Sequence, residues 1–174
     1  MAKAGDREAE RARAKAQLER LKDAKELKQF SHNCKRHGFE DIAAKASHKA
    51  EIRTRLDQAN IWEERAERQL PPAKNELEKK IRECWIKSCG LLGRVGMRSR
   101  QMAERHGYVE ATLRMVTKER IGGGNFEKLV ELGGIRYTSE YQLCKYLRDK
   151  ADPRILKLVE KLLRQYGLEA GRDY

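Results

Sequence analysis

Residues that can bind a metal ion gather in the first third of the chain: His32, Cys34, His37 and His48. Imidazole nitrogens and thiolates are ligands that zinc accepts. Zinc sites of this kind usually contain a paired Cys-x-x-Cys element, and the sequence has none. Cys84 and Cys89 are five residues apart, so on a helix they point to different faces. We therefore expect no metal site, and we expect the four cysteines to be reduced thiols.

A glycine-rich segment, residues 121–126, reads Ile-Gly-Gly-Gly-Asn-Phe. Glycine loops hold nucleotide phosphates when they follow a strand and end in Lys followed by Ser or Thr. This segment lacks that ending, and no strand is predicted before it. Carboxylates elsewhere alternate with Lys and Arg along helical stretches, as exposed ion pairs do. We interpret the segment as a turn, and we expect a binding protein without a cofactor instead of an enzyme.

The chain is strongly basic, with 39 Lys and Arg against 27 Asp and Glu and a formal net charge of +12. Residues 71–174 hold 22 basic and 14 acidic side chains, so they carry most of the excess. Positive charge of this size attracts polyanions. We expect nucleic acid as the partner, with DNA favoured over RNA. Acidic membrane surfaces are the weaker alternative, because no Lys- and Arg-faced helix carries bulky apolar residues opposite.

No segment approaches the roughly 18 consecutive apolar residues of a membrane span. Charged residues begin at Lys3, where a secretion signal would have an apolar core. A cytoplasmic location without membrane contact is therefore expected.

Hydrophobic spacing predicts an all-α fold with two parts. Apolar residues recur at steps of three and four over residues 6–37, without Gly or Pro, which predicts one helix that Gly38 ends. A second helix, with Asp41 as its cap, continues to the double proline at 71–72. Residues 1–70 are thus predicted to form an antiparallel, coiled-coil-like helical hairpin. Its seam buries little alone, so we expect residues 6–70 to pack on a protein partner or on the rest of the chain.

Residues 71–174 are predicted to form a basic helical domain. Its last helix is the best defined, because Asp152 can cap it, Pro153 suits its first turn and Gly167 ends it. The dense Ile, Leu and Val content of this helix suits either a core or a dimer interface. Trp62 and Trp85 lie on predicted helices, where packing is favoured over stacking on bases. Other short helices are expected over residues 77–90, 126–132 and 138–147.

Four residues within the segment 99–116 share the spacing of two crossing helices: Ala103, Gly107, Leu113 and Val116. A small residue permits a close helix crossing, and glycine permits the positive φ of a tight turn. With Met102 as an apolar neighbour, the segment resembles a helix-turn-helix of the bacterial regulator kind. The resemblance implies that the second helix enters the major groove of duplex DNA.

Carried onto this sequence, the resemblance implies specific contacts. Arg114 is the candidate for a bidentate contact with guanine, and Lys118 and Arg120 are candidates for phosphate contacts. Ser99 is predicted to cap the first helix. Residues 94–120 carry seven basic and three acidic side chains, as phosphate contact requires. The complete predicted set is Arg98, Ser99, Arg100, Gln101, Glu110, Ala111, Arg114, Met115, Lys118 and Arg120.

These observations predict a nucleic-acid-binding protein that contacts duplex DNA through residues 99–118, with transcription regulation as the expected role. One such element contacts little DNA, so a homodimer is expected. Two other interpretations stay open. One is a helical adaptor or inhibitor that binds a protein of a nucleic-acid machine, and the other is binding of structured RNA.

Overall fold

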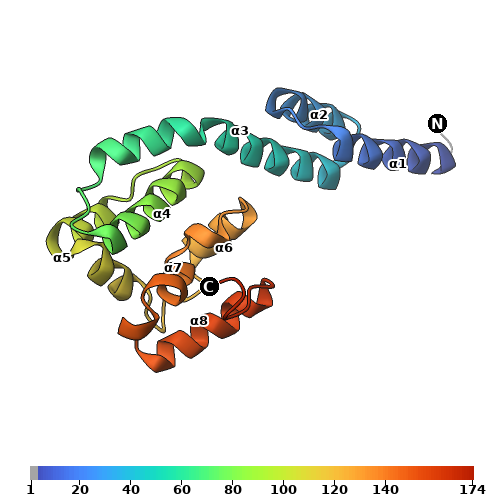
Figure 1. Cartoon of the computed structure of the whole chain (residues 1–174). Coiled ribbons are helices and arrows are strands. Elements are labelled where there is room, and N and C mark those ends of the chain that lie inside the picture. The colour runs from blue at the N-terminus through green and yellow to red at the C-terminus, as the bar shows by residue number, and fades with distance from the viewer. Residues whose placement is uncertain (1–3) are drawn as a thin grey trace. The chain divides into compact units, whose positions relative to one another are not determined.

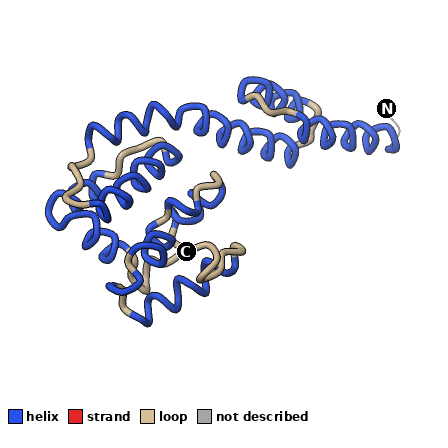
Figure 2. The backbone as a smooth tube through the Cα atoms, in the orientation of Figure 1, coloured by secondary structure: helices blue, strands red, loops and turns tan. Residues whose placement is uncertain are grey.

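The computed structural model describes residues 4–174, with side chains described from Arg7 onward. Over these residues it contains eight α-helices and two short 3-10 turns but no strand (Figure 2). The all-α prediction is confirmed. The chain divides into two compact units, Met1–Asp57 and Gln58–Tyr174, and their boundary lies inside α3 (Glu40–Gln69).

The boundary between the units lies where the buried residues of α3 change from one core to the other, and not at the end of the helix. Ala50 is the last residue of α3 in the core of the first unit, whereas Ala66 and Leu70 are buried in the core of the second. The double proline at 71–72 does end the helix, as expected, because proline lacks the N–H that a helix needs. The predicted division at residue 70 therefore marks a helix end, and the second unit begins three turns earlier.

The first unit contains α1 (Ala4–Arg20), α2 (Ala24–Arg36) and the first half of α3 (Figure 1). The prediction of one helix over residues 6–37 is wrong. Asp23 starts a new helix, because its side chain accepts hydrogen bonds from the backbone N–H groups of Lys25 and Glu26 at 2.8 and 3.0 Å. The break allows Leu18 and Leu27, on different helices, to enter one core.

Small side chains bring α2 and α3 close together in the first unit. Ala43 and Ala46 are fully buried there, and the Ser31 hydroxyl donates to the Ala43 carbonyl at 2.8 Å. Asp41 was expected to cap α3, but the helix already begins at Glu40. Asp41 instead accepts a hydrogen bond from the Arg11 guanidinium at 2.9 Å, which lowers the pKa of its carboxyl.

Five helices follow α3 in the second unit: α4 (Glu76–Leu92), α5 (Met97–Met115), α6 (Gly124–Glu131), α7 (Ser139–Tyr146) and α8 (Pro153–Gln165) (Figure 1). The 3-10 turns η1 (Ile135–Tyr137) and η2 (Arg148–Lys150) flank α7. Asp152 caps α8, as predicted, and Thr138 caps α7. Leu143 and Leu147, at the centre of the core, are each 1% exposed.

Gly90 was expected to end α4, but it lies inside that helix. A side chain there would collide with the Ala59 carbonyl and the Glu63 side chain, so glycine permits the close approach of α3 and α4. The helix ends two residues later, where Gly93 adopts a left-handed φ of 65°.

A kink at Gly107 divides α5 into two short helices. Gly107 has φ 75° and ψ 169°, a conformation that other residues rarely adopt. The Glu78 carboxylate accepts the backbone N–H of Tyr108 at 3.1 Å and that of Lys74 at 2.8 Å. The Tyr108 hydroxyl donates to the Pro71 carbonyl at 2.6 Å. The kink is therefore held by two hydrogen bonds of Tyr108, one to Glu78 in the first turn of α4 and one to Pro71 in the segment between α3 and α4.

Replacing Gly107 with Ala should lower the free energy of unfolding by about 1–3 kcal/mol. Alanine would have to adopt the positive φ of this position, and its Cβ would collide with the Glu78 carboxylate. Urea unfolding followed by circular dichroism measures the change. Gly124→Ala is the control, because its Cβ would meet no atom within 4 Å and its φ is not in the left-handed region. Equal effects of the two substitutions would contradict the assigned role of Gly107.

Candidate nucleic-acid interface

The first half of α5 exposes three of the predicted contact residues, Arg98, Arg100 and Gln101. The prediction that Ser99 caps this helix is wrong, because the N-cap is Gly96, which offers no side-chain hydrogen bond. Ser99 lies one turn into the helix, with its hydroxyl 3.8 Å from the sulfur of Met115. The two halves of α5 thus contact each other near their outer ends.

The second half of α5 is packed against the core around most of its circumference. Tyr108, Ala111 and Thr112 are at most 1% exposed. Ala111 therefore cannot face a DNA groove, and that prediction is wrong because the core of the second unit occupies its side of the helix. Lys118 is exposed, but it lies in the turn after α5 and not on the predicted second helix.

Only a narrow strip of this half faces outward, and it is internally paired. The Arg114 guanidinium donates to the Glu110 carboxylate at 2.6 Å and lies 3.4 Å from the His106 ring nitrogen. The expected inward frame is confirmed at three positions, since Ala103 and Val116 are each 4% exposed and Gly107 has a positive φ, whereas Leu113 is only partly buried. The strip that remains for contact with nucleobases therefore consists of the Glu110–Arg114 ion pair.

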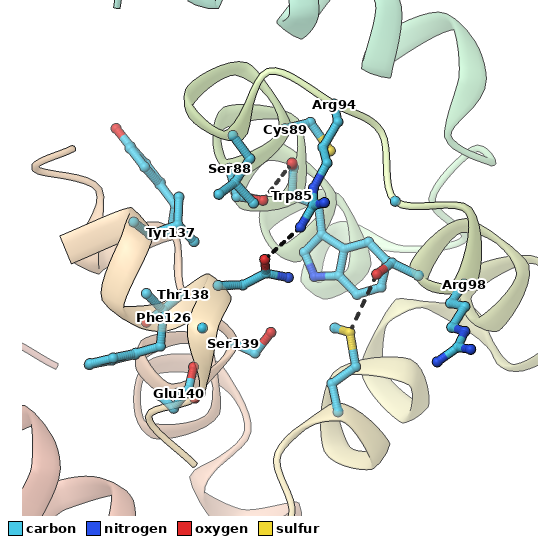
Figure 3. A pocket seen from close by; sticks show the side chains of 18 of the residues that line it. Trp85, Ser88, Cys89, Arg94, Arg98, Phe126, Tyr137, Thr138, Ser139 and Glu140 are labelled. Atoms are coloured by element: carbon cyan, nitrogen blue, oxygen red, sulfur yellow. Dashed lines mark hydrogen bonds between the residues drawn. The ribbon is translucent and has the colours of Figure 1, made fainter. Parts of the chain in front are cut away.

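A cavity of about 870 Å³ opens beside α5 in the second unit (Figure 3). The end of α4 and the start of α5 form one side, and the segment from Glu119 through α6 to α7 forms the other. Apolar side chains of Leu92, Phe126 and Leu129 contribute to its wall. Four members of the predicted set line it, and the other six lie outside its lining. The four are Arg98, Ser99, Met115 and Arg120.

Three exposed arginines, Arg94, Arg98 and Arg120, line the mouth of this cavity. Arg94 was not among the predicted contacts, although it belongs to the basic stretch 94–120. It reaches across the cavity in Figure 3 and donates to the side-chain oxygen of Asn125 at 2.9 Å. Glu119 is the one exposed carboxylate among the lining residues. The mouth therefore has a positive excess.

The other carboxyl group of the cavity is Glu140, which is 7% exposed. It accepts the backbone N–H of Gly122 at 3.2 Å. Burial raises its pKa, and the hydrogen bonds from its own N–H and from that of Gly122 oppose this rise. Glu140 thus holds the glycine turn in place.

Two of the residues that line the cavity each have a fully buried polar atom without a hydrogen-bond partner in the described part of the chain: the indole Nε1 of Trp85 and the amide oxygen of Gln142. An unsatisfied buried donor or acceptor costs about 1–3 kcal/mol. The Trp85 ring packs edge to face on Tyr108, with the centroids 5.2 Å apart. Figure 3 shows its nitrogen edge turned toward the side of the cavity that carries Ser139. The predicted packing role of Trp85 is confirmed, and its indole Nε1 is buried without a hydrogen-bond partner among the described residues.

The glycine segment supplies a further feature that sequence reasoning missed. It was interpreted as a turn, and Ile121 and Gly122 do lie in one, but Gly123 is the N-cap of α6 and Gly124 is its first residue. Glycine has no side chain to accept the first N–H groups of the helix, so no side-chain hydrogen bond caps this end. The signal was present in the sequence as glycines followed by a short amphipathic stretch.

The histidines near Cys34 do not gather around it, since His32, His37 and His48 are exposed whereas Cys34 is buried. Over residues 4–174, no cluster of three or more His, Cys, Asp and Glu side chains has the arrangement of a metal site. All four cysteines are free thiols. In the same range, every helix is too short or too polar to cross a membrane.

No family model, curated protein or solved structure matches this chain.

Glu140→Gln should change how stability depends on pH. Because burial raises the Glu140 pKa in the folded state, the folded protein is destabilised as pH rises from the unfolded value through the folded one. The variant keeps an acceptor for the Gly122 N–H but cannot ionise. We expect its free energy of unfolding to exceed that of the parent protein by an amount that grows with pH and then levels off. Urea titrations between pH 4 and pH 8 measure the difference, and a constant difference would contradict this assignment.

Proposed function

We propose that the second unit binds nucleic acid through the mouth of the cavity. The observation that carries the proposal is that three exposed arginines line one opening: Arg94 and Arg98, four residues apart at the junction of α4 and α5, and Arg120 from the turn after α5. Guanidinium groups bind phosphate oxygens through paired N–H donors. The net charge of +12 adds a long-range attraction for a polyanion.

The surface of α5 supports contact with the phosphate backbone more than reading of base edges. Arg98 and Gln101 are exposed on its first half, where they can donate to phosphates, whereas the exposed Arg100 is paired with Glu104 at 2.7 Å. The outer strip of its second half carries the Glu110–Arg114 ion pair, which would have to open before Arg114 could reach a guanine. Binding is therefore expected to be strongly salt-dependent and weakly dependent on sequence.

A triple variant tests this surface. Arg94→Gln, Arg98→Gln and Arg120→Gln together should weaken binding and reduce the slope of log K against log salt concentration by roughly 2–3, as loss of three phosphate contacts predicts. Fluorescence anisotropy with a single strand, a DNA duplex and a structured RNA of equal length measures both quantities.

The control for the triple variant replaces three exposed cations of α8, outside the cavity lining, with Gln, namely Arg154, Lys157 and Arg164. It removes the same charge, so it should change the slope by much less. An equal effect of the two triple variants would assign the binding to net charge alone. No binding by the parent protein near physiological salt would overturn the proposal and favour a protein-binding adaptor.

The homodimer and the regulatory role remain predictions. If two copies act together on a duplex, selection from a random duplex pool should enrich a palindrome, and sedimentation should give twice the chain mass of 20.2 kDa. A monomer that enriches no sequence would support the backbone-contact mode alone.

A further inference from the structure

We propose that the mouth of the cavity binds a single strand of nucleic acid in preference to a duplex, with one unstacked base against Met97 and the apolar side chains beside it. The inference rests on the proposed function and deepens it, because it names the form of nucleic acid that the arginines would hold. Single strands of DNA and of RNA offer the same phosphates and free bases, and the experiment below compares the two.

The arginines of the mouth are available to the phosphates of a strand. Among the described residues, Arg94, Arg98 and Arg120 are exposed and form no ion pair. Arg94 donates to the neutral side chain of Asn125, so its charge is not cancelled there. The exposed carboxylate of Glu119 opposes only part of this charge. A positive opening attracts any phosphate backbone, so charge alone does not distinguish a single strand from a duplex.

Accessible apolar side chains in the same lining favour a strand with unstacked bases. Met97 is 74% exposed, the largest exposed fraction of any large apolar side chain among the described residues. Leu92, Val95 and Met115 are partly exposed and line the same cavity. Apolar side chains pack on the faces of bases, and methionine suits this contact because it is flexible and polarisable. Neighbouring bases cover these faces in a duplex, whereas a single strand leaves them free.

The concave shape of the site agrees with this preference. Its volume of about 870 Å³ lies within the usual range of small-molecule sites, roughly 300–1,000 Å³, so it has room for a base with its sugar but not for a duplex. The half of α5 that was expected to enter a duplex groove is covered on the side of Ala111, which is fully buried. The surface that remains accessible is therefore a charged opening with an apolar interior.

The test measures binding of the full chain to labelled probes of equal length by fluorescence anisotropy. The probes are oligothymidylate, oligouridylate, the duplex of oligothymidylate with its complement, and a DNA strand of abasic residues. We expect at least one of the two single strands to bind at least about fivefold more tightly than the duplex at the same salt concentration. Charge alone predicts the opposite order, because the duplex has twice as many phosphates. A difference between oligothymidylate and oligouridylate would show which source the site selects.

Met97→Gln removes the apolar contact without changing the charge. It should weaken binding of the preferred single strand at least about threefold and leave the slope of log K against log salt concentration unchanged. It should bind the abasic strand as tightly as the parent protein does, because that strand offers no base to contact. Ile61→Gln is the matched control, since Ile61 is 60% exposed on α3 and lies outside the cavity lining. Urea midpoints check that neither substitution destabilises the protein.

The inference is overturned if the duplex binds as tightly as the better single strand, or if Met97→Gln binds that strand as the parent protein does. It is also overturned if Ile61→Gln has the same effect, or if Met97→Gln loses as much affinity for the abasic strand as for the strand with bases. Binding that the arginine triple variant weakens would then leave the proposed function standing. Single-strand binding that depends on Met97 but not on the three arginines would leave the base contact standing without the proposed function.

Discussion

The buried carboxylate of Glu78 is the interaction on which the second unit depends. At 6% exposure it needs donors to replace water, and it finds them in the backbone N–H groups of Tyr108 and Lys74. The first bond caps the second half of α5 at the kink, and the second ties down the loop before α4. Gly107 makes this possible, since a larger residue would occupy the place of the carboxylate.

This cap determines where the rest of α5 goes. Beyond the kink the helix packs Tyr108 against Trp85 and then brings Met115 beside Ser99, so that the two halves of α5 meet the cavity at different points. The turn that follows carries Arg120 to the mouth, and Glu140 anchors that turn through Gly122. Gly107 and the hydrogen bond from Tyr108 to Glu78 thus determine the corner in α5 and, through it, where charged residues lie around the cavity.

The same packing explains why the helix-turn-helix resemblance describes the inner frame of α5 better than its outer surface. Ala103, Gly107 and Val116 match the expected crossing because small or apolar residues at these positions suit any tight corner between two helices. What the corner presents outward depends on its neighbours. Here they cover Ala111, and they leave Arg114 paired with Glu110.

Local sequence determined the elements whose signals lie within a few residues. Asp152 with Pro153, Thr138 and the double proline at 71–72 place helix ends correctly because capping and the missing proline N–H act over one turn. The net charge likewise follows from composition alone. Asp23 shows the limit of such reasoning, because its capping bonds had to compete with a continuous helix pattern, and the gain from burying Leu18 and Leu27 together is a tertiary one.

The cavity was decided only by tertiary structure. Its wall joins residues from α4, α5, α6 and α7. Arg94 and Arg98 are near neighbours in the sequence, but no spacing records that Arg120 shares their opening, since the packing of the second unit sets that distance. Short-range hydrogen bonding thus specified the helices, and long-range packing specified the site.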